Sequence, residues 1–200
     1  MRLVILGGPG AGKGTQTRML CRQLGISEIS TSDILRQAIA SQTELGHQAQ
    51  VYVEKGELVP DELMIEFMRE RLLRDDAKGN GWLLEGYPRT AFQAEELDFL
   101  LEDLGQRLDW AIYLEVPELV MMNRCLARSP TRSDNLKENP SANDSRPDDR
   151  PEIIQRRINL FHECTIPILE YYGYCNRLLT INADQSPEQV QQEIVQKLQL

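Results

Sequence analysis

Short apolar runs alternate with segments of helical periodicity along most of this 200-residue chain. The runs are brief and rich in aliphatic residues, which is typical of strands buried on both faces. Strands are expected at residues 2–6, 28–30, 82–85, 110–115 and 177–181. Helices are expected at 16–24, 61–73, 91–104, 117–127, 151–172 and 187–198. Strands that alternate with crossover helices indicate an α/β fold with a parallel sheet of about five strands and helices on both faces.

Two segments interrupt this alternation. Residues 31–60 carry helical patterns without a convincing strand, so they are interpreted as a helical insertion. Residues 129–149 are almost wholly polar and contain three prolines, so they cannot bury a core of their own. A disordered linker is the ordinary interpretation of such a stretch, whereas a long loop inside a compact domain is often an active-site lid. We expect a single domain with a core at 1–30, 61–128 and 150–200, interrupted by the insertion at 31–60 and by the polar segment at 129–149.

A glycine-rich stretch, GGPGAGKGT at residues 7–15, follows the first strand and opens the first helix. Glycines let successive backbone N–H groups face one anion, and the helix N-terminus adds its partial positive charge. Lys13 can reach the outer phosphates of a nucleotide. The general pattern has Ser or Thr directly after the lysine, but here Gly14 stands there and Thr15 follows. The stretch predicts a phosphate-binding loop.

Two further segments are expected beside this loop, because each follows a strand of the same parallel sheet. Residues 30–36 (STSDILR) follow the second strand and open a helix, with Thr31 or Ser32 expected as its cap. Residues 86–90 (GYPRT) follow the third strand and place Arg89 at the carboxyl edge of the sheet. Taken singly, the first segment is equally typical of an ordinary capped helix, and the second of an ordinary turn that ends in an arginine.

Arginines bracket the polar segment. Arg124 and Arg128 share one face of the helix before it, and Arg146 lies near its end. Arg156 and Arg157 follow on the next helix, about 100° apart, so only one of them can point into a shared site. A solvated charged face is the usual reason for such arginines, but guanidinium groups also suit bidentate binding of phosphate.

Composition and charge limit the kinds of partner and the location that we expect for this protein. A net charge of −9 argues against a nucleic-acid surface, which needs a continuous basic face. No run approaches the roughly 20 apolar residues of a membrane span, and no secretory segment precedes the first strand, which favours a cytoplasmic protein. The four cysteines are far apart and form no C-x-x-C pair, so no zinc site is expected.

Taken together, these motifs resemble those of the adenylate kinases over essentially the whole chain. The matching stretches are residues 7–16, 29–36, 56–63, 81–90 with Gln93, 116–128, and Arg146 with Asp148, Asp149 and Arg157. Gly14, unusual among phosphate-binding loops, is typical of this family. The resemblance implies reversible phosphoryl transfer from MgATP to AMP, giving two ADP, by a monomer. It implies that the polar segment at 129–149 is a lid that closes over both nucleotides. It implies Mg²⁺ as the cofactor.

The resemblance also implies residue roles. ATP would be bound by Gly10, Ala11, Gly12, Lys13, Gly14, Thr15, Arg124, Arg128 and Gln185. AMP would be bound by Thr31, Arg36, Glu57, Leu58, Val59, Gly86, Tyr87, Pro88, Arg89, Gln93, Arg146 and Arg157. Catalytic charge neutralisation would come from Lys13, Arg89, Arg128, Arg146 and Arg157. Glu85 would contact Mg²⁺ only through water.

Glu85 and Tyr87 depart from the family, which usually has Asp and Phe at these positions; a functional enzyme is still expected. One alternative is a kinase for UMP or CMP, but Thr31 and Gln93 favour adenine as the acceptor base. Another is a catalytically silent nucleotide sensor. The retained cations argue against that alternative, because a protein that only binds nucleotides need not neutralise a group in transfer.

Overall fold

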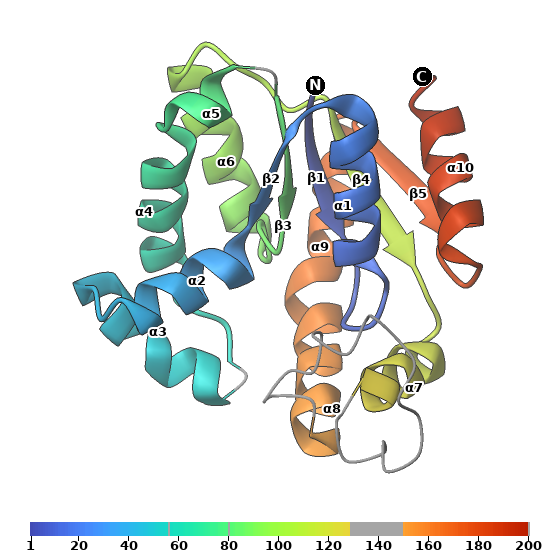
Figure 1. The fold of residues 1–200 in the computed structure, drawn as a ribbon, viewed down its shortest axis with the longest axis horizontal. Helices are drawn as coiled ribbons and strands as arrows, with labels where there is room; N and C mark the ends of the chain where they lie inside the picture. The colour runs from blue at the N-terminus through green and yellow to red at the C-terminus, as the bar shows by residue number, and fades with distance from the viewer. Residues whose placement is uncertain (56, 80, 129–149, 200) are drawn as a thin grey trace.

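The computed structural model describes residues 1–55, 57–79, 81–128 and 150–199. Its centre is a sheet of five parallel strands in the order β2-β3-β1-β4-β5 (Figure 1). The strands are β1 (Arg2–Leu6), β2 (Ser27–Ser30), β3 (Trp82–Glu85), β4 (Trp110–Glu115) and β5 (Leu178–Asn182). The expected α/β fold class is confirmed, and the strand bounds differ from the expected ones by at most one residue.

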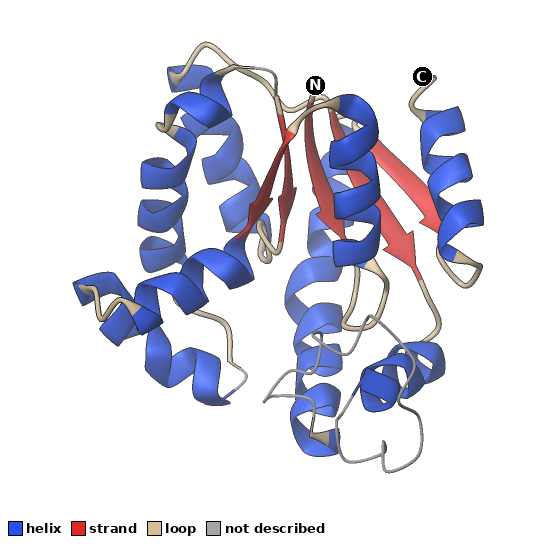
Figure 2. Ribbon diagram, viewed as in Figure 1, coloured by secondary structure: helices blue, strands red, loops and turns tan. Residues whose placement is uncertain are grey.

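Helices cover both faces of the sheet (Figure 2). On one face α1 (Lys13–Leu24) packs against α10 (Pro187–Lys197), and on the other α6 (Ala91–Asp103) packs against α9 (Ile166–Tyr174). The remaining helices are α2 (Thr31–Ala40), α3 (Glu44–Lys55), α4 (Asp61–Leu72), α5 (Asp75–Lys78), α7 (Glu118–Arg128) and α8 (Pro151–Leu160). Double coverage explains why the central strands are apolar at successive positions.

The strand order creates the place for a site. The chain runs from the central β1 to β2 and β3 on one side, and then to β4 and β5 on the other. The direction of winding therefore changes at β1, and ligands of such sheets bind beyond the carboxyl ends of the strands at this point. The loop after β1 and the turn after β3 leave the sheet there as neighbours, because Ile5 pairs with Glu85.

The helix expected at residues 151–172 is interrupted. Between α8 and α9 the backbone forms a π-helical turn, Phe161–Thr165, which directly precedes α9. Pro167 explains the interruption, because its ring has no N–H for the carbonyl of residue 163 and would collide with that carbonyl in a regular α-helix. Widening the turn accommodates the proline without ending the helical rod.

The expected cap of the helix after β2 was wrong. Ser30 is the N-cap: it has an extended backbone conformation, and its side chain accepts a hydrogen bond from the Asp33 N–H at 3.3 Å. The helix begins at Thr31, immediately after the strand ends. Thr31 uses its hydroxyl elsewhere and donates it to the Glu85 carbonyl at 3.1 Å.

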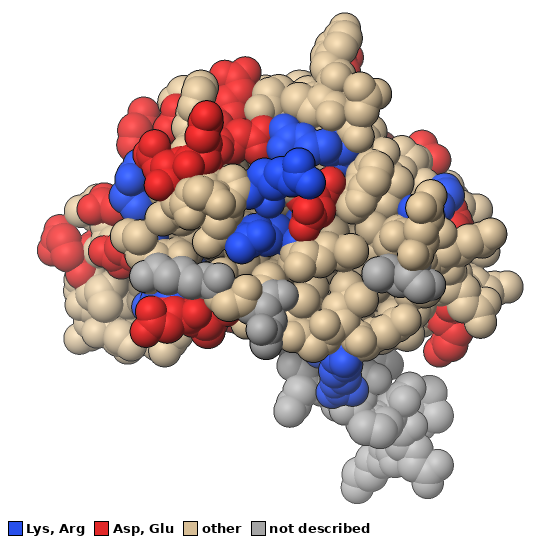
Figure 3. All heavy atoms as spheres, turned by 90° about the horizontal axis from the view of Figure 1, so that it is seen from above, with Lys and Arg blue, Asp and Glu red and all other residues tan. Residues whose placement is uncertain are grey.

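The end of the molecule opposite the loops has a mixed charge. Figure 3 looks onto this end, which lies at the top of Figure 1 and holds the amino ends of the strands. Acidic side chains gather toward one side of it, and basic side chains lie beside them. In the part of the chain that the structure describes, no helix is long and apolar enough to cross a membrane.

Asp98 on α6 joins this helix to α9 and to Arg177, the residue before β5. It accepts hydrogen bonds from Tyr171 Oη at 2.6 Å and from Arg177 Nη1 at 3.0 Å, and also pairs with Arg177 Nη2. Both side chains of this ion pair are more than three-quarters buried. The pairing raises the pKa of Arg177, and burial followed by the hydrogen bond to Asp98 raises the pKa of Tyr171.

Replacing Asp98 with asparagine should lower the free energy of unfolding by about 1–3 kcal/mol, because two charge-assisted hydrogen bonds from Arg177 are weakened. Urea denaturation of wild type and Asp98→Asn measures this difference. Glu95→Gln is the matched control: it removes one charge from the same helix at an exposed position and should leave the midpoint unchanged. An equal loss in both variants would assign the effect to net charge.

Candidate active site

The loop after β1 is shaped by its glycines. Gly10 and Gly12 have φ values of 79° and 93°, in the left-handed region that glycine adopts readily. A Cβ at Gly10 would lie 2.6 Å from the Met121 carbonyl oxygen, so only glycine lets the loop rest on α7. Helix α1 begins at Lys13, three residues before its expected start, because Lys13 and Gly14 already belong to its first turn. The N-terminus of α1 therefore points into the loop.

Lys13 folds back over the loop from which it comes. Its Nζ donates hydrogen bonds to the carbonyls of Gly7 at 2.7 Å and Gly8 at 2.9 Å. These bonds hold the ammonium group on the concave side of the loop, where an anion bound by the backbone N–H groups would meet it.

The turn after β3 depends on a second glycine. Gly86 has a φ of 89°, and a Cβ there would lie 2.2 Å from the Thr31 hydroxyl oxygen. The same turn orients Arg89, whose Nε donates to the Gly86 carbonyl at 2.8 Å. Tyr87 is buried, with 2 % of its surface exposed, and burial raises the pKa of its phenol. The turn is thus a rigid support for one guanidinium group.

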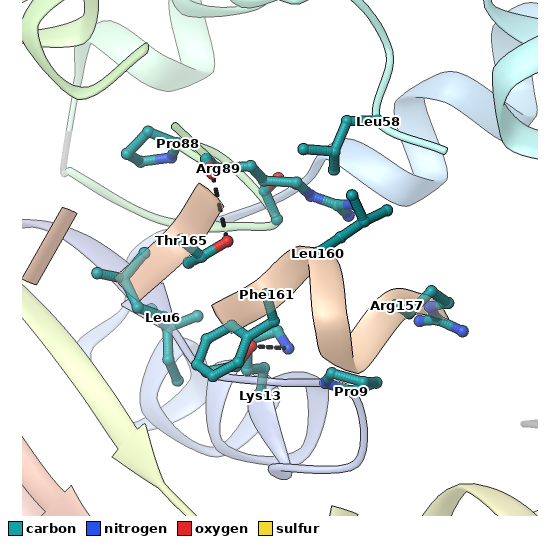
Figure 4. Close-up of a pocket in the computed structure, with 13 residues that line it drawn as sticks. Leu6, Pro9, Lys13, Leu58, Pro88, Arg89, Arg157, Leu160, Phe161 and Thr165 are labelled. Atoms are coloured by element: carbon teal, nitrogen blue, oxygen red, sulfur yellow. Dashed lines mark hydrogen bonds between the residues drawn. The ribbon is translucent and has the colours of Figure 1, made fainter. Parts of the chain in front are cut away.

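One cleft brings the loop, the turn and α8 together (Figure 4). Lys13, Arg89 and Arg157 line it, and Leu58 reaches it from the segment before α4. Figure 4 shows Arg89 beside Leu58 and Leu160, and Lys13 next to Phe161. The other lining residues are Ile5, Leu6, Gly7, Pro9, Gly86, Pro88 and Thr165. No acidic side chain occurs among these described lining residues, so the cleft suits a phosphorylated ligand.

The π-helical turn supplies lining residues that sequence reasoning missed. Phe161 and Thr165 both face the cleft, and the Thr165 hydroxyl donates to the Arg89 carbonyl at 3.2 Å (Figure 4). Pro167 was the available signal, since a proline within a helical pattern marks a local change of helix geometry. π-Helical turns are frequent at functional sites.

Arg124 and Gln185, which are expected to bind ATP, both lie at the loop after β5, away from this cleft. Arg124 Nη1 donates to the Ala183 carbonyl at 3.0 Å, and its Nη2 lies 3.7 Å from an Asp184 oxygen. Gln185 in the same loop donates from Nε2 to the Asn182 carbonyl at 2.8 Å and to Glu193 at 3.0 Å. The structure therefore brings Arg124 and Gln185 together, beside the phosphate loop that α7 supports.

The residues expected at AMP have different surroundings. Arg36 is about half exposed and its guanidinium pairs with Asp33 at 2.5 Å. Glu57 pairs with Arg156 at 2.7 Å, so of the two adjacent arginines Arg157 lines the cleft and Arg156 bridges to the insertion. Val59 is buried. None of Arg36, Glu57 and Val59 lines the cleft described above.

Gln93 lies directly behind the turn and is buried, with 2 % of its surface exposed. Its Oε1 accepts the Arg89 backbone N–H at 2.8 Å, and its Nε2 donates to Asp61 Oδ1 at 2.8 Å. The Thr90 hydroxyl lies 3.3 Å from both carboxylate oxygens of Asp61. Asp61 lies in residues 56–63, one of the stretches that resemble the adenylate kinases, but the sequence predicted no role for it.

Glu85 ends β3 next to the start of α1. Its carboxylate lies 3.4 Å from the position that a Cβ on Gly14 would occupy. Burial, and then the Glu85 carboxylate, raise the pKa of Glu28 on the neighbouring strand. The Glu85 carboxylate and the Thr15 hydroxyl are hard oxygen donors beside the phosphate loop, and this donor set fits Mg²⁺.

Some expected residues cannot be placed. Arg146, the lid at 129–149 and the side chain of Arg128 lie outside the described residues. Over the described ranges, no three His, Cys, Asp or Glu side chains are grouped so that they could hold a metal ion.

Several known proteins are similar to this chain over almost its full length. The model of the family described as adenylate kinase matches residues 5–176. The chain is 59% identical over 198 residues to adenylate kinase 2 of Nostoc sp. strain PCC 7120, covering 99% of this chain and 98% of that protein. It is 52% identical to adenylate kinase 2 of Synechocystis sp. strain PCC 6803, covering 99% and 100%. Identity to the adenylate kinase of Caldicellulosiruptor saccharolyticus is 40%, covering 99% of each.

These matches confirm the family that the motifs indicated. Membership of this family also accounts for three features of the chain: the parallel sheet, the glycine loop with Gly14 after Lys13, and the cationic cleft. The chain belongs to the adenylate kinase family.

Proposed function

We propose that this chain catalyses reversible transfer of the terminal phosphoryl group from MgATP to AMP, giving two molecules of ADP. The observation that carries the proposal is the convergence of Lys13, Arg89 and Arg157 on one cleft, between a phosphate loop and the turn after β3. Full-length similarity to adenylate kinases supports the same reaction.

The ATP half of the site is built on the loop after β1. Backbone N–H groups from Gly10 to Thr15 and the α1 N-terminus hold the phosphates, with Lys13 on the transferred group. Arg124, fixed by the Ala183 carbonyl, covers the adenine together with Gln185. Arg128 completes the contacts to the ATP phosphates.

The AMP half is built on the turn after β3 and the insertion. Arg89 and Arg36 bind the AMP phosphate, with Arg146 and Arg157 between this phosphate and the group in transfer. The Arg36–Asp33 pair must then open, which is inexpensive because both side chains are more than half exposed. Thr31, Gln93, Gly86 to Pro88 and the segment of Glu57, Leu58 and Val59 surround the base and ribose.

The chemistry requires positioning and charge neutralisation. The nucleophile is a phosphate oxygen of AMP that is already ionised at neutral pH, so no general base is needed. Cations bring the two anions together and stabilise the charge that spreads over the equatorial oxygens in the transition state. Water competes as an acceptor, so closure of the segment at 129–149 over both nucleotides limits hydrolysis.

Mg²⁺ is proposed as the cofactor, held by the Thr15 hydroxyl and, through water, by Glu85. When bound, the ion neutralises phosphate charge on ATP. We further propose that the protein acts in the cytoplasm as a monomer.

A coupled assay of ADP formation from ATP and AMP tests the reaction directly. With AMP, UMP, CMP and GMP at fixed ATP, AMP should be preferred over UMP by about 10²-fold or more in kcat/KM, because buried polar groups reject a base that leaves them unpaired. Comparable turnover of UMP would favour the pyrimidine kinase alternative. Nucleotide binding without ADP formation would favour the sensor alternative.

Removing a cleft cation should abolish most of the activity. Lys13→Ala and Arg89→Ala are each expected to lower kcat by about 10³-fold, the scale of losing one preorganised charge at a transferring phosphoryl group. Arg22→Ala is the control, because Arg22 is exposed on α1 and does not line the cleft. Losses below about tenfold in both cleft variants would contradict their catalytic roles.

Glu85 should set the Mg²⁺ requirement. Glu85→Gln removes the charge while keeping the length, and should raise the Mg²⁺ concentration needed for half-maximal rate. Glu85→Asp keeps the charge, so its requirement should stay near that of the wild type. Steady-state rates in a Mg²⁺ titration measure both. An unchanged requirement in Glu85→Gln would remove Glu85 from the metal site.

A further inference from the structure

The side-chain amide of Gln93 is held at both of its polar atoms. Oε1 accepts the Arg89 N–H, and Nε2 donates to Asp61 Oδ1, each at 2.8 Å. These partners come from different parts of the chain, since Asp61 opens α4 and Arg89 lies in the turn after β3. The amide is therefore fixed by the tertiary fold and not by its own helix.

Both partners act in one direction only. A backbone N–H can only donate, and an ionised carboxylate can only accept. The neighbouring Thr90 hydroxyl follows the same polarity, because it accepts the backbone N–H of Gln93 at 3.2 Å and donates to Asp61. Turning the amide over would set Nε2 against the Arg89 N–H and Oε1 against the Asp61 carboxylate. At a side chain with 2 % exposure, little water is available to relieve that conflict.

The fixed amide has capacity left for a ligand. After these contacts Nε2 keeps one N–H and Oε1 keeps one lone pair. The edge of adenine offers a matching pair, an exocyclic amino donor and a ring-nitrogen acceptor. A 6-oxopurine reverses this pattern, with a carbonyl acceptor and a ring N–H donor at the same places. Only a turned amide could match a 6-oxopurine in the same pose.

We propose that Asp61 is a positioning residue that determines base specificity. By accepting from Nε2, it locks the Gln93 amide in the orientation that matches adenine and rejects 6-oxopurine monophosphates of equal size. This inference rests on the proposed role of Gln93 in binding AMP.

Asp61 also lies in the first turn of α4, where any carboxylate is favoured by the helix dipole. Glu62 is adjacent in the same turn and exposed, and no contact joins it to Gln93 in the described structure. Glu62→Gln therefore removes the same charge from the same helix end without touching the amide, and serves as the matched control.

The test compares kcat/KM for AMP with that for IMP, a purine nucleotide with the reversed pattern. Asp61→Asn should lower the AMP-to-IMP ratio by about tenfold, the scale of one hydrogen bond to a charged group. It should raise KM for AMP and leave KM for ATP unchanged. Glu62→Gln should leave the ratio and both KM values at their wild-type levels.

Gln93→Leu separates this inference from the proposed function. Gln93→Leu should itself lower the AMP-to-IMP ratio, and adding Asp61→Asn should then cause no further loss, because Asp61 acts through the amide. An equal further loss in the double variant, or a ratio unchanged in Asp61→Asn, would overturn the role of Asp61. A wild-type ratio in Gln93→Leu would overturn the AMP role of Gln93 as well.

Thermal unfolding of each variant checks that it is folded at the assay temperature. Asp61→Ser is the second variant if Asp61→Asn does not accumulate as folded protein, since serine also suits the first turn of a helix and lacks the charged acceptor. Loss of stability without loss of selectivity in either variant would show that Asp61 only supports α4.

Discussion

Parallel pairing of β1 with β3 is the constraint on which the site depends. Ile5 lies opposite Glu85, so the glycine loop and the turn carrying Arg89 leave the same edge of the sheet as neighbours. Both then rely on glycine for a close backbone approach, Gly10 against α7 and Gly86 against Thr31. With these contacts made, Lys13 and Arg89 face one cleft, and the π-helical turn and Arg157 enclose it. The cleft is thus a consequence of strand register.

Charge is distributed unevenly between this cleft and the rest of the chain. The protein as a whole carries a net charge of −9, yet the described residues that line the cleft include three cations and no acid. A ligand rich in phosphate is therefore attracted at one place and repelled over the acidic surface elsewhere. In the proposed function, specificity for the base comes from a neutral group, the Gln93 amide, whose Nε2 donates to Asp61.

Much of this arrangement was predictable from sequence, because it depends on local patterns. Apolar runs located the strands within one residue, and the order of strands and loops placed Lys13 and Arg89 at the same edge. The rest depends on tertiary contacts that periodicity does not encode. The π-helical turn forms because Pro167 lies inside a rod that packing preserves. Ser30 caps α2, while Thr31 donates its hydroxyl to the Glu85 carbonyl. The partners of Arg156 and Gln93 come from distant segments.

Three cations of the proposed site already have partners within the protein. Lys13 is held by the Gly7 and Gly8 carbonyls, Arg89 by the Gly86 carbonyl, and Arg36 by Asp33. In the proposed function, a bound nucleotide replaces these partners. It does not meet cations that lack hydrogen bonds. An exchange yields less net binding free energy than the number of ionic contacts suggests. For a reversible reaction this moderation has a use, because a smaller binding free energy lets either nucleotide pair dissociate more readily.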